Sequence, residues 1–145
     1  MTDWKAGGEE YLPLLNAAED TYALPRDLLA RVAYQESHWR TDIVDGTVKS
    51  PTGAVGLMQL EPQFFPGAGA DWRADILTAA KYLANLHHEF QDWQLAIAAY
   101  DWGPGDVAKY RAGIYKVLPT ETFNYVHAVF TDVPVSGSLM SLTET

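Results

Sequence analysis

The sequence contains no cysteine, which excludes disulfide bonds and thiolate metal sites and gives no information on the redox compartment. Long apolar runs are also absent. The longest covers residues 95–100, whereas roughly 20 apolar residues are needed to cross a bilayer. The first residues have neither a basic start nor an apolar core, so they predict no secretory signal. We therefore expect no membrane insertion.

Positive charge is scarce as well. Ten Lys and Arg residues stand against nineteen Asp and Glu residues, giving a net charge of −9. Without a basic run to neutralise phosphates, no nucleic-acid partner is expected. The four histidines show neither i, i+4 pairing nor an HExxH pattern, so no metal site is expected. The five Trp and eight Tyr side chains favour recognition of a ligand through an aromatic cleft.

The apolar spacing predicts a mainly α protein. A length of 145 residues indicates one domain over 1–145. Residues 132–145 are expected to form a mobile tail. Helical periodicity is found in four segments, a fifth helix is expected from Pro119, and two regions rich in Gly, Pro or small polar residues predict loops. The predicted helices cover residues 9–22, 26–39, 76–90 and 95–100, and the predicted loops lie at 41–52 and after residue 102.

Glu36 occupies a position where a core residue is due. Leu29, Val32 and Ala33 form an apolar stripe on the predicted helix, and Glu36 is next on that stripe. Apolar surroundings raise the pKa of a carboxyl group and suit it to act as a general acid in glycan cleavage. The simpler interpretation is an exposed ion pair with Arg40 at i+4, worth about 0.3–0.5 kcal/mol. The helix alone favours the ion pair.

Three further elements change that balance. Glu36-Ser37 is followed by Gly56-Leu57-Met58-Gln59, by the segment Ala99–Gly105, and by the segment Leu118–Val126. In this order they resemble the catalytic domain of the soluble lytic transglycosylase (SLT, goose-lysozyme-like) family, over about residues 17–129. The resemblance implies a lysozyme-like α fold with helices around a glycan-binding cleft. It also implies bacterial peptidoglycan as the substrate, no cofactor, and a monomer as an isolated domain.

The resemblance further implies the role of each residue. Glu36 is the sole catalytic carboxyl group, acting first as acid and then as base. Asp101 stands where the family has Asn, and Trp102 where it has a small residue. As alternatives, Ser37 solvates a helix end, Met58 fills a core gap and Tyr125 lies at a core edge. The implied substrate-binding residues are Ser37, Met58, Gln59, Tyr100, Asp101 and Tyr125, with Tyr125 approaching the catalytic carboxyl.

Two other functions stay open. A lysozyme-type hydrolase needs a second carboxyl group, which Asp42 or Asp45 could supply, although aspartates beside a glycine are often turn formers. A virion module could also grip glycan without cutting it. The absence of a signal favours a phage-encoded enzyme, or one delivered to the cell wall by another route. Asp101 either acts on Glu36 as a like charge, raising its pKa, or only caps the turn before Gly103.

Overall fold

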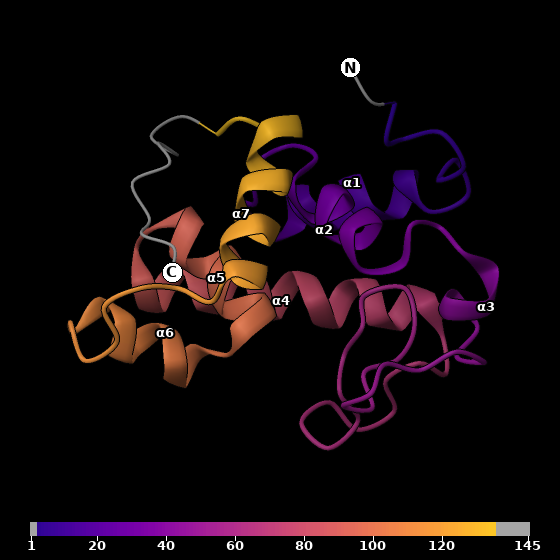
Figure 1. Ribbon diagram of the computed structural model, residues 1–145. Coiled ribbons are helices and arrows are strands. Elements are labelled where there is room, and N and C mark those ends of the chain that lie inside the picture. The colour runs from indigo at the N-terminus through magenta and orange to yellow at the C-terminus, as the bar shows by residue number, and fades with distance from the viewer. Residues whose placement is uncertain (1–2, 136–145) are drawn as a thin grey trace. The chain divides into compact units, whose positions relative to one another are not determined.

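A computed structural model describes residues 3–135 of the protein (Figure 1). This part of the chain is mainly α-helical, as predicted, and its only β pairing is an isolated antiparallel bridge between Val55 and Leu60. Most of the predicted mobile tail lies outside the described residues. The helices are α1 (Leu12–Thr21), α2 (Leu28–Ser37), α3 (Thr41–Val44), α4 (Trp72–Phe90), α5 (Trp93–Trp102), α6 (Pro104–Arg111) and α7 (Thr120–Asp132).

The chain divides into two compact units, Met1–Tyr82 and Leu83–Thr145. The boundary falls within α4. The prediction of a single domain over 1–145 stays a prediction.

In the first unit, α1 packs against α2 (Figure 1). Helix α1 buries Leu15 and Ala18, and α2 buries Leu29 and Val32 of the predicted apolar stripe. The buried Glu19 carboxylate of α1 accepts hydrogen bonds from backbone N–H groups at the start of α2. It therefore caps α2 from a neighbouring element.

Helix α2 is shorter than its predicted range at both ends. Asp27 precedes it with φ 71°, and His38 and Trp39 follow it with φ 51° and 60°. These left-handed residues interrupt the helical hydrogen-bond ladder, which the apolar periodicity does not reveal. The loop expected at 41–52 also begins with the short helix α3, so that part of the loop prediction was wrong.

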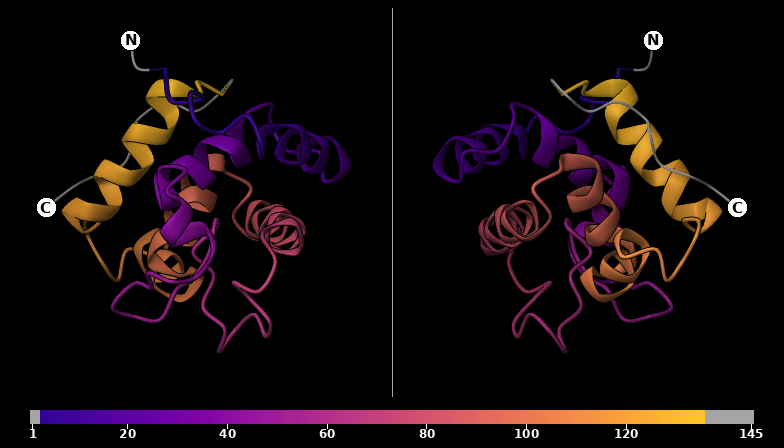
Figure 2. Two further views of the ribbon diagram at one scale, coloured as in Figure 1. Left: turned by 90° about the vertical axis from the view of Figure 1, so that its right-hand side faces the viewer. Right: turned by 90° about the vertical axis from the view of Figure 1, so that its left-hand side faces the viewer.

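In the second unit, α5 contacts both α6 and α7, and all three can be followed in Figures 1 and 2. The Asp92 side chain caps α5 by accepting from the Leu95 N–H at 3.0 Å. Gly103 ends α5 with φ 99°. Pro104 then begins α6, although the sequence predicted a loop there, because proline both ends one helix and suits the first turn of the next.

Helix α7 begins where it was expected and buries Val126, Val129 and Phe130. No helix among the described residues is long and apolar enough to cross a membrane.

Candidate functional site

Glu36 lies in the last turn of α2, one residue before the helix ends. The residues that precede it on the apolar stripe, Val32 and Ala33, are fully buried. Glu36 itself is half-buried. The predicted setting, a carboxyl group at the edge of an apolar helix face, is therefore present in the first unit.

Ser37 forms hydrogen bonds at the end of α2 with a side chain that lies in the protein interior. Its side chain is fully buried, its hydroxyl donates to the Ala33 carbonyl at 2.8 Å, and it accepts from the Trp39 N–H at 3.1 Å. This agrees with the helix-end interpretation of Ser37. A buried hydroxyl with both bonds inside the fold has no surface to offer a sugar.

Arg40 does not continue the helix that carries Glu36, because α2 ends at Ser37. Its guanidinium donates through Nε and Nη2 to the two carboxylate oxygens of Asp42, at 3.2 and 2.8 Å. Helical i+4 geometry, on which the predicted ion pair with Glu36 depended, does not apply across this break.

The two aspartates considered as the second carboxyl group of a hydrolase form hydrogen bonds with nearby residues of the chain. The hydrogen bond from Arg40 lowers the pKa of Asp42. Thr47 lowers the pKa of Asp45 through hydrogen bonds from its side chain and from its N–H, the latter at 2.9 Å. Asp45 is thus a turn former, the alternative that the neighbouring glycine indicated.

The segment Gly56–Gln59 forms the tight turn inside the Val55–Leu60 bridge. Gln59 is half-buried, has φ 51°, and donates from Nε2 to the Gly56 carbonyl at 2.9 Å. Met58 is fully buried, as a core methionine would be. Of the two predicted substrate-binding residues on this turn, only Gln59 has exposed surface.

An unpredicted carboxyl group, Asp75 of α4, lies beside this turn and binds the following loop. Both its oxygens accept from the Gly69 N–H, at 3.2 and 3.0 Å. A Cβ at Gly56 would lie 2.7 Å from Asp75 Oδ2, and the φ of 80° at Gly56 independently favours glycine. Burial raises the pKa of Asp75, the Gly69 N–H lowers it, and the charge of Asp71 raises it. Its sequence signal was weak, since an acidic residue in a first helical turn is common.

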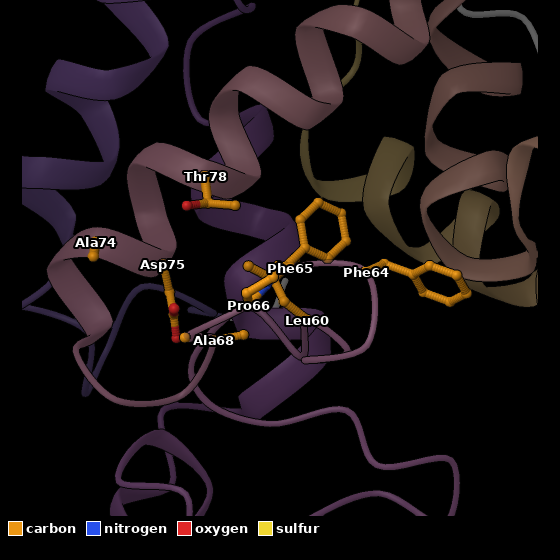
Figure 3. A pocket seen from close by; sticks show the side chains of 9 residues that line it. Leu60, Phe64, Phe65, Pro66, Ala68, Ala74, Asp75 and Thr78 are labelled. Carbon is orange, nitrogen blue, oxygen red and sulfur yellow. The ribbon is translucent and has the colours of Figure 1, made fainter.

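A cavity of about 260 Å³ lies beside this carboxyl group, within the first unit (Figure 3). Asp75 and Thr78 reach it from α4, and the labelled Phe65, Pro66 and Leu60 approach it from the loop. The ring of Phe64 is 69% exposed. The predicted site residues are not among those that line this cavity.

In the second unit, Tyr100 and Asp101 lie in the last turn of α5, and Tyr125 lies on α7. Tyr100 and Asp101 are half-buried, and Tyr125 is buried. Burial raises the pKa of Asp101, a hydrogen bond from the Thr122 side chain lowers it, and the charge of Glu121 raises it. The contact with Thr122 ties the end of α5 to α7. The predicted site residues thus form two groups, one in each unit.

Among residues 3–135, no group of three or more His, Asp or Glu side chains could hold a metal ion.

Comparison with known proteins gives consistent matches. The family model described as "Transglycosylase SLT domain" matches residues 13–121, a range that contains every predicted site residue except Tyr125. Two similar proteins are named membrane-bound lytic murein transglycosylase F. The one from Maricaulis maris is 38% identical over 66% of this chain, and the one from Desulfosudis oleivorans is 33% identical over 67%.

A third relative, membrane-bound lytic murein transglycosylase F 2 of Alkalilimnicola ehrlichii, is 37% identical over 61% of this chain. The matched regions cover 22% of the Maricaulis maris protein, 23% of the Desulfosudis oleivorans protein and 21% of the Alkalilimnicola ehrlichii protein. The chain therefore spans about a fifth of the length of the curated relatives it matches.

Proposed function

Because the chain belongs to the transglycosylase SLT domain family, we propose that it is a peptidoglycan lytic transglycosylase. The observation that carries the proposal is the position of Glu36, half-buried at the end of an apolar helix face and inside the family-matched range. A single carboxyl group in such a place can hold and return one proton.

The reaction uses that one group twice. Glu36 donates its proton to the oxygen that joins N-acetylmuramic acid to N-acetylglucosamine, and the bond between this oxygen and the anomeric carbon breaks. The muramyl acetamide oxygen shields the cation-like carbon. The Glu36 carboxylate then takes the proton of the 6-hydroxyl of the same sugar, whose oxygen bonds to the anomeric carbon. The product has a 1,6-anhydromuramyl end, and no water is consumed.

The other residues have supporting roles in this proposal. Gln59, Tyr100 and Asp101 keep exposed surface and are the proposed glycan contacts. Ser37, Met58 and Tyr125 are buried, and we assign them to holding the exposed residues in place. The proposed partner is a bacterial glycan strand.

The local bonding of Asp42 and Asp45 favours a lyase over a lysozyme-type hydrolase. The hydrolase needs a second carboxyl group that is poised beside the sugar. Asp42 is held by Arg40 and Asp45 by Thr47, so both candidates serve the loop that contains them.

The direct test is Glu36→Gln, compared with Glu89→Gln as a matched control on an exposed glutamate. The amide fills the same space but cannot exchange a proton. We expect the rate of peptidoglycan clearance by Glu36→Gln to fall by at least about 100-fold, a typical contribution of general acid catalysis. Its circular dichroism spectrum and the activity of Glu89→Gln should not change. Near-normal clearance by folded Glu36→Gln would reject Glu36 as the catalyst.

A further inference from the structure

The segment Asp3–Tyr11 lies before the family-matched residues, yet it is built into the first unit. It folds as successive turns, with Gly8 N–H donating to the Lys5 carbonyl at 2.9 Å and Tyr11 N–H to the Gly8 carbonyl at 2.9 Å. Trp4 and Tyr11 are 7% and 5% exposed. Trp4, Gly8 and Tyr11 of this segment are thus buried, although the segment lies outside the family-matched range.

The partner of this segment is Trp39, which is itself buried. The indole Nε1–H of Trp39 donates to the Trp4 carbonyl at 2.8 Å. The Tyr11 ring stacks on the indole with centroids 5.8 Å apart. The two residues fix the indole by a directional bond and by ring packing.

Gly8 completes the contact. A Cβ at Gly8 would lie 2.5 Å from Cε2 and 2.7 Å from Cζ2 of the Trp39 ring. Gly8 is not among the glycines with positive φ, so its backbone conformation does not require glycine. The close approach of the indole does.

Trp39 is in turn tied to the end of α2. His38 and Trp39 both have left-handed backbone conformations, which cost of order 1–3 kcal/mol for residues other than glycine. The Trp39 N–H donates to the Ser37 hydroxyl at 3.1 Å, and that hydroxyl closes the helix on Ala33. Glu36 is the residue immediately before this closure.

We propose that the segment Asp3–Tyr11 is a strap that positions Glu36, acting through the indole of Trp39. The proposal rests on the function proposed above. The strap is also fastened at the other end of α2, because Lys5 Nζ lies 2.8 Å from Asp27 Oδ2. Burial of the indole holds two unfavourable left-handed residues in place, and these residues set where the helix stops. The strap, with its Gly8, and Trp39 act as positioning elements and do not contact the substrate.

The test uses Gly8→Ala and Trp39→Phe in the full chain, with Trp72→Phe as the matched control. Gly8→Ala pushes against the indole, and Trp39→Phe removes the Nε1–H donor. Trp72 packs edge-on against the same Tyr11 ring, with centroids 4.8 Å apart, but has no part in the end of α2. For each variant we would measure kcat and KM on purified glycan strands, the melting temperature, and the amide resonances of Glu36 and Ser37.

We expect Gly8→Ala and Trp39→Phe to lower kcat about tenfold with KM nearly unchanged, because a misplacement of about 1 Å can cost about 100-fold in rate. Their Glu36 and Ser37 amide resonances should shift. Trp72→Phe should lower the melting temperature and leave kcat and both resonances as in the wild type. A fall in kcat that merely follows the melting temperature in all three variants would overturn the proposal, as would unchanged kcat in the first two.

The resonances separate this proposal from the proposed function. If the wild type cleaves no glycan, the proposed function fails. The amide shifts of Glu36 in Gly8→Ala, measured against Trp72→Phe, would still decide whether the strap sets the end of α2.

Discussion

At the scale of single residues, burial raises the pKa of Glu19, Asp75 and Asp101. Each carboxyl group accepts hydrogen bonds from a different donor. Glu19 accepts from backbone N–H groups at the start of α2, Asp75 from the Gly69 N–H, and Asp101 from the Thr122 side chain. These bonds stabilise the charged form, yet they offset only part of the cost of burial. Buried carboxyl groups therefore join elements here.

Asp101 gives a prediction with a definite sign. Its pKa in the folded protein is raised above 3.8, so the folded state holds the proton more tightly than the unfolded state. The stability that this proton contributes is present below about pH 3.8 and is lost as the pH rises through the folded pKa. Asp101→Asn carries no charge, so its free energy of unfolding relative to wild type should increase over that window. The gain is about 1.4 kcal/mol per unit of pKa difference.

Urea denaturation of both proteins at several pH values between 3 and 7 measures this gain. A difference in unfolding free energy that stays constant with pH would contradict the buried-charge account of Asp101. The same variant restores the amide that the family has at this position, so its pH–rate profile also tests the predicted coupling to Glu36. If Asp101 raises the pKa of Glu36, the basic limb of kcat/KM moves to lower pH in Asp101→Asn.

The half-buried position of Glu36 at the edge of an apolar helix face could be predicted from the apolar stripe, whereas its catalytic role depends on the ordered motifs and stays a proposal. The placement of Ser37 and Met58 could not be predicted. Whether a short polar or a flexible apolar side chain faces inward depends on contacts between elements, which sequence spacing does not contain. The role of Asp75 could not be predicted for the same reason, since its partner Gly69 lies on a loop without periodicity.

At the scale of elements, the helices with strong apolar periodicity were predicted within a few residues. The third predicted helix, 76–90, lies within α4, which begins one turn earlier at Trp72. The errors lie where the backbone ends a helix by left-handed residues, as at His38, or begins one at a proline, as at Pro104. Helix α6 has little amphipathic pattern because it is short and mostly exposed. Periodicity therefore finds helices that bury an apolar face and misses a short helix that buries only Val107.

The start of α2 depends on a single side chain from α1. Glu19 accepts from Asp27 N–H at 2.9 Å through Oε1 and from Ala30 N–H at 3.0 Å through Oε2. Asn16 Nδ2 adds a third bond at 2.8 Å. We expect Glu19→Ala to lose about 2–4 kcal/mol of unfolding free energy, because buried donors are left without an acceptor.

Glu19→Gln is the informative comparison. It keeps one acceptor oxygen and nearly the same volume, so the expected loss is smaller, about 1–2 kcal/mol. Chemical denaturation monitored by circular dichroism measures both variants. A Glu19→Gln variant as stable as the wild type, beside a large loss in Glu19→Ala, would show that volume, and not capping of α2 by the carboxylate, explains the role of Glu19.

At the scale of the whole molecule, the net charge of −9 and the abundance of Trp and Tyr favour recognition of a ligand through an aromatic cleft. In the first unit, the Trp39 indole is buried and contacts two other buried aromatic residues, Trp4 and Tyr11. The number of aromatic residues alone therefore does not identify a binding surface. The ordered motifs, which lie almost entirely in the family-matched range, carried the functional inference.

The central claim is that one carboxyl group cleaves the glycan without adding water, and the mass of the released muropeptides tests it most directly. Peptidoglycan digested with the protein, with lysozyme, and with Glu36→Gln would be analysed before and after borohydride reduction. The account predicts products that are one water lighter than those of lysozyme, unchanged by borohydride at the muramyl end, and absent with Glu36→Gln. Full-mass products with reducible muramyl ends would contradict it and identify a hydrolase.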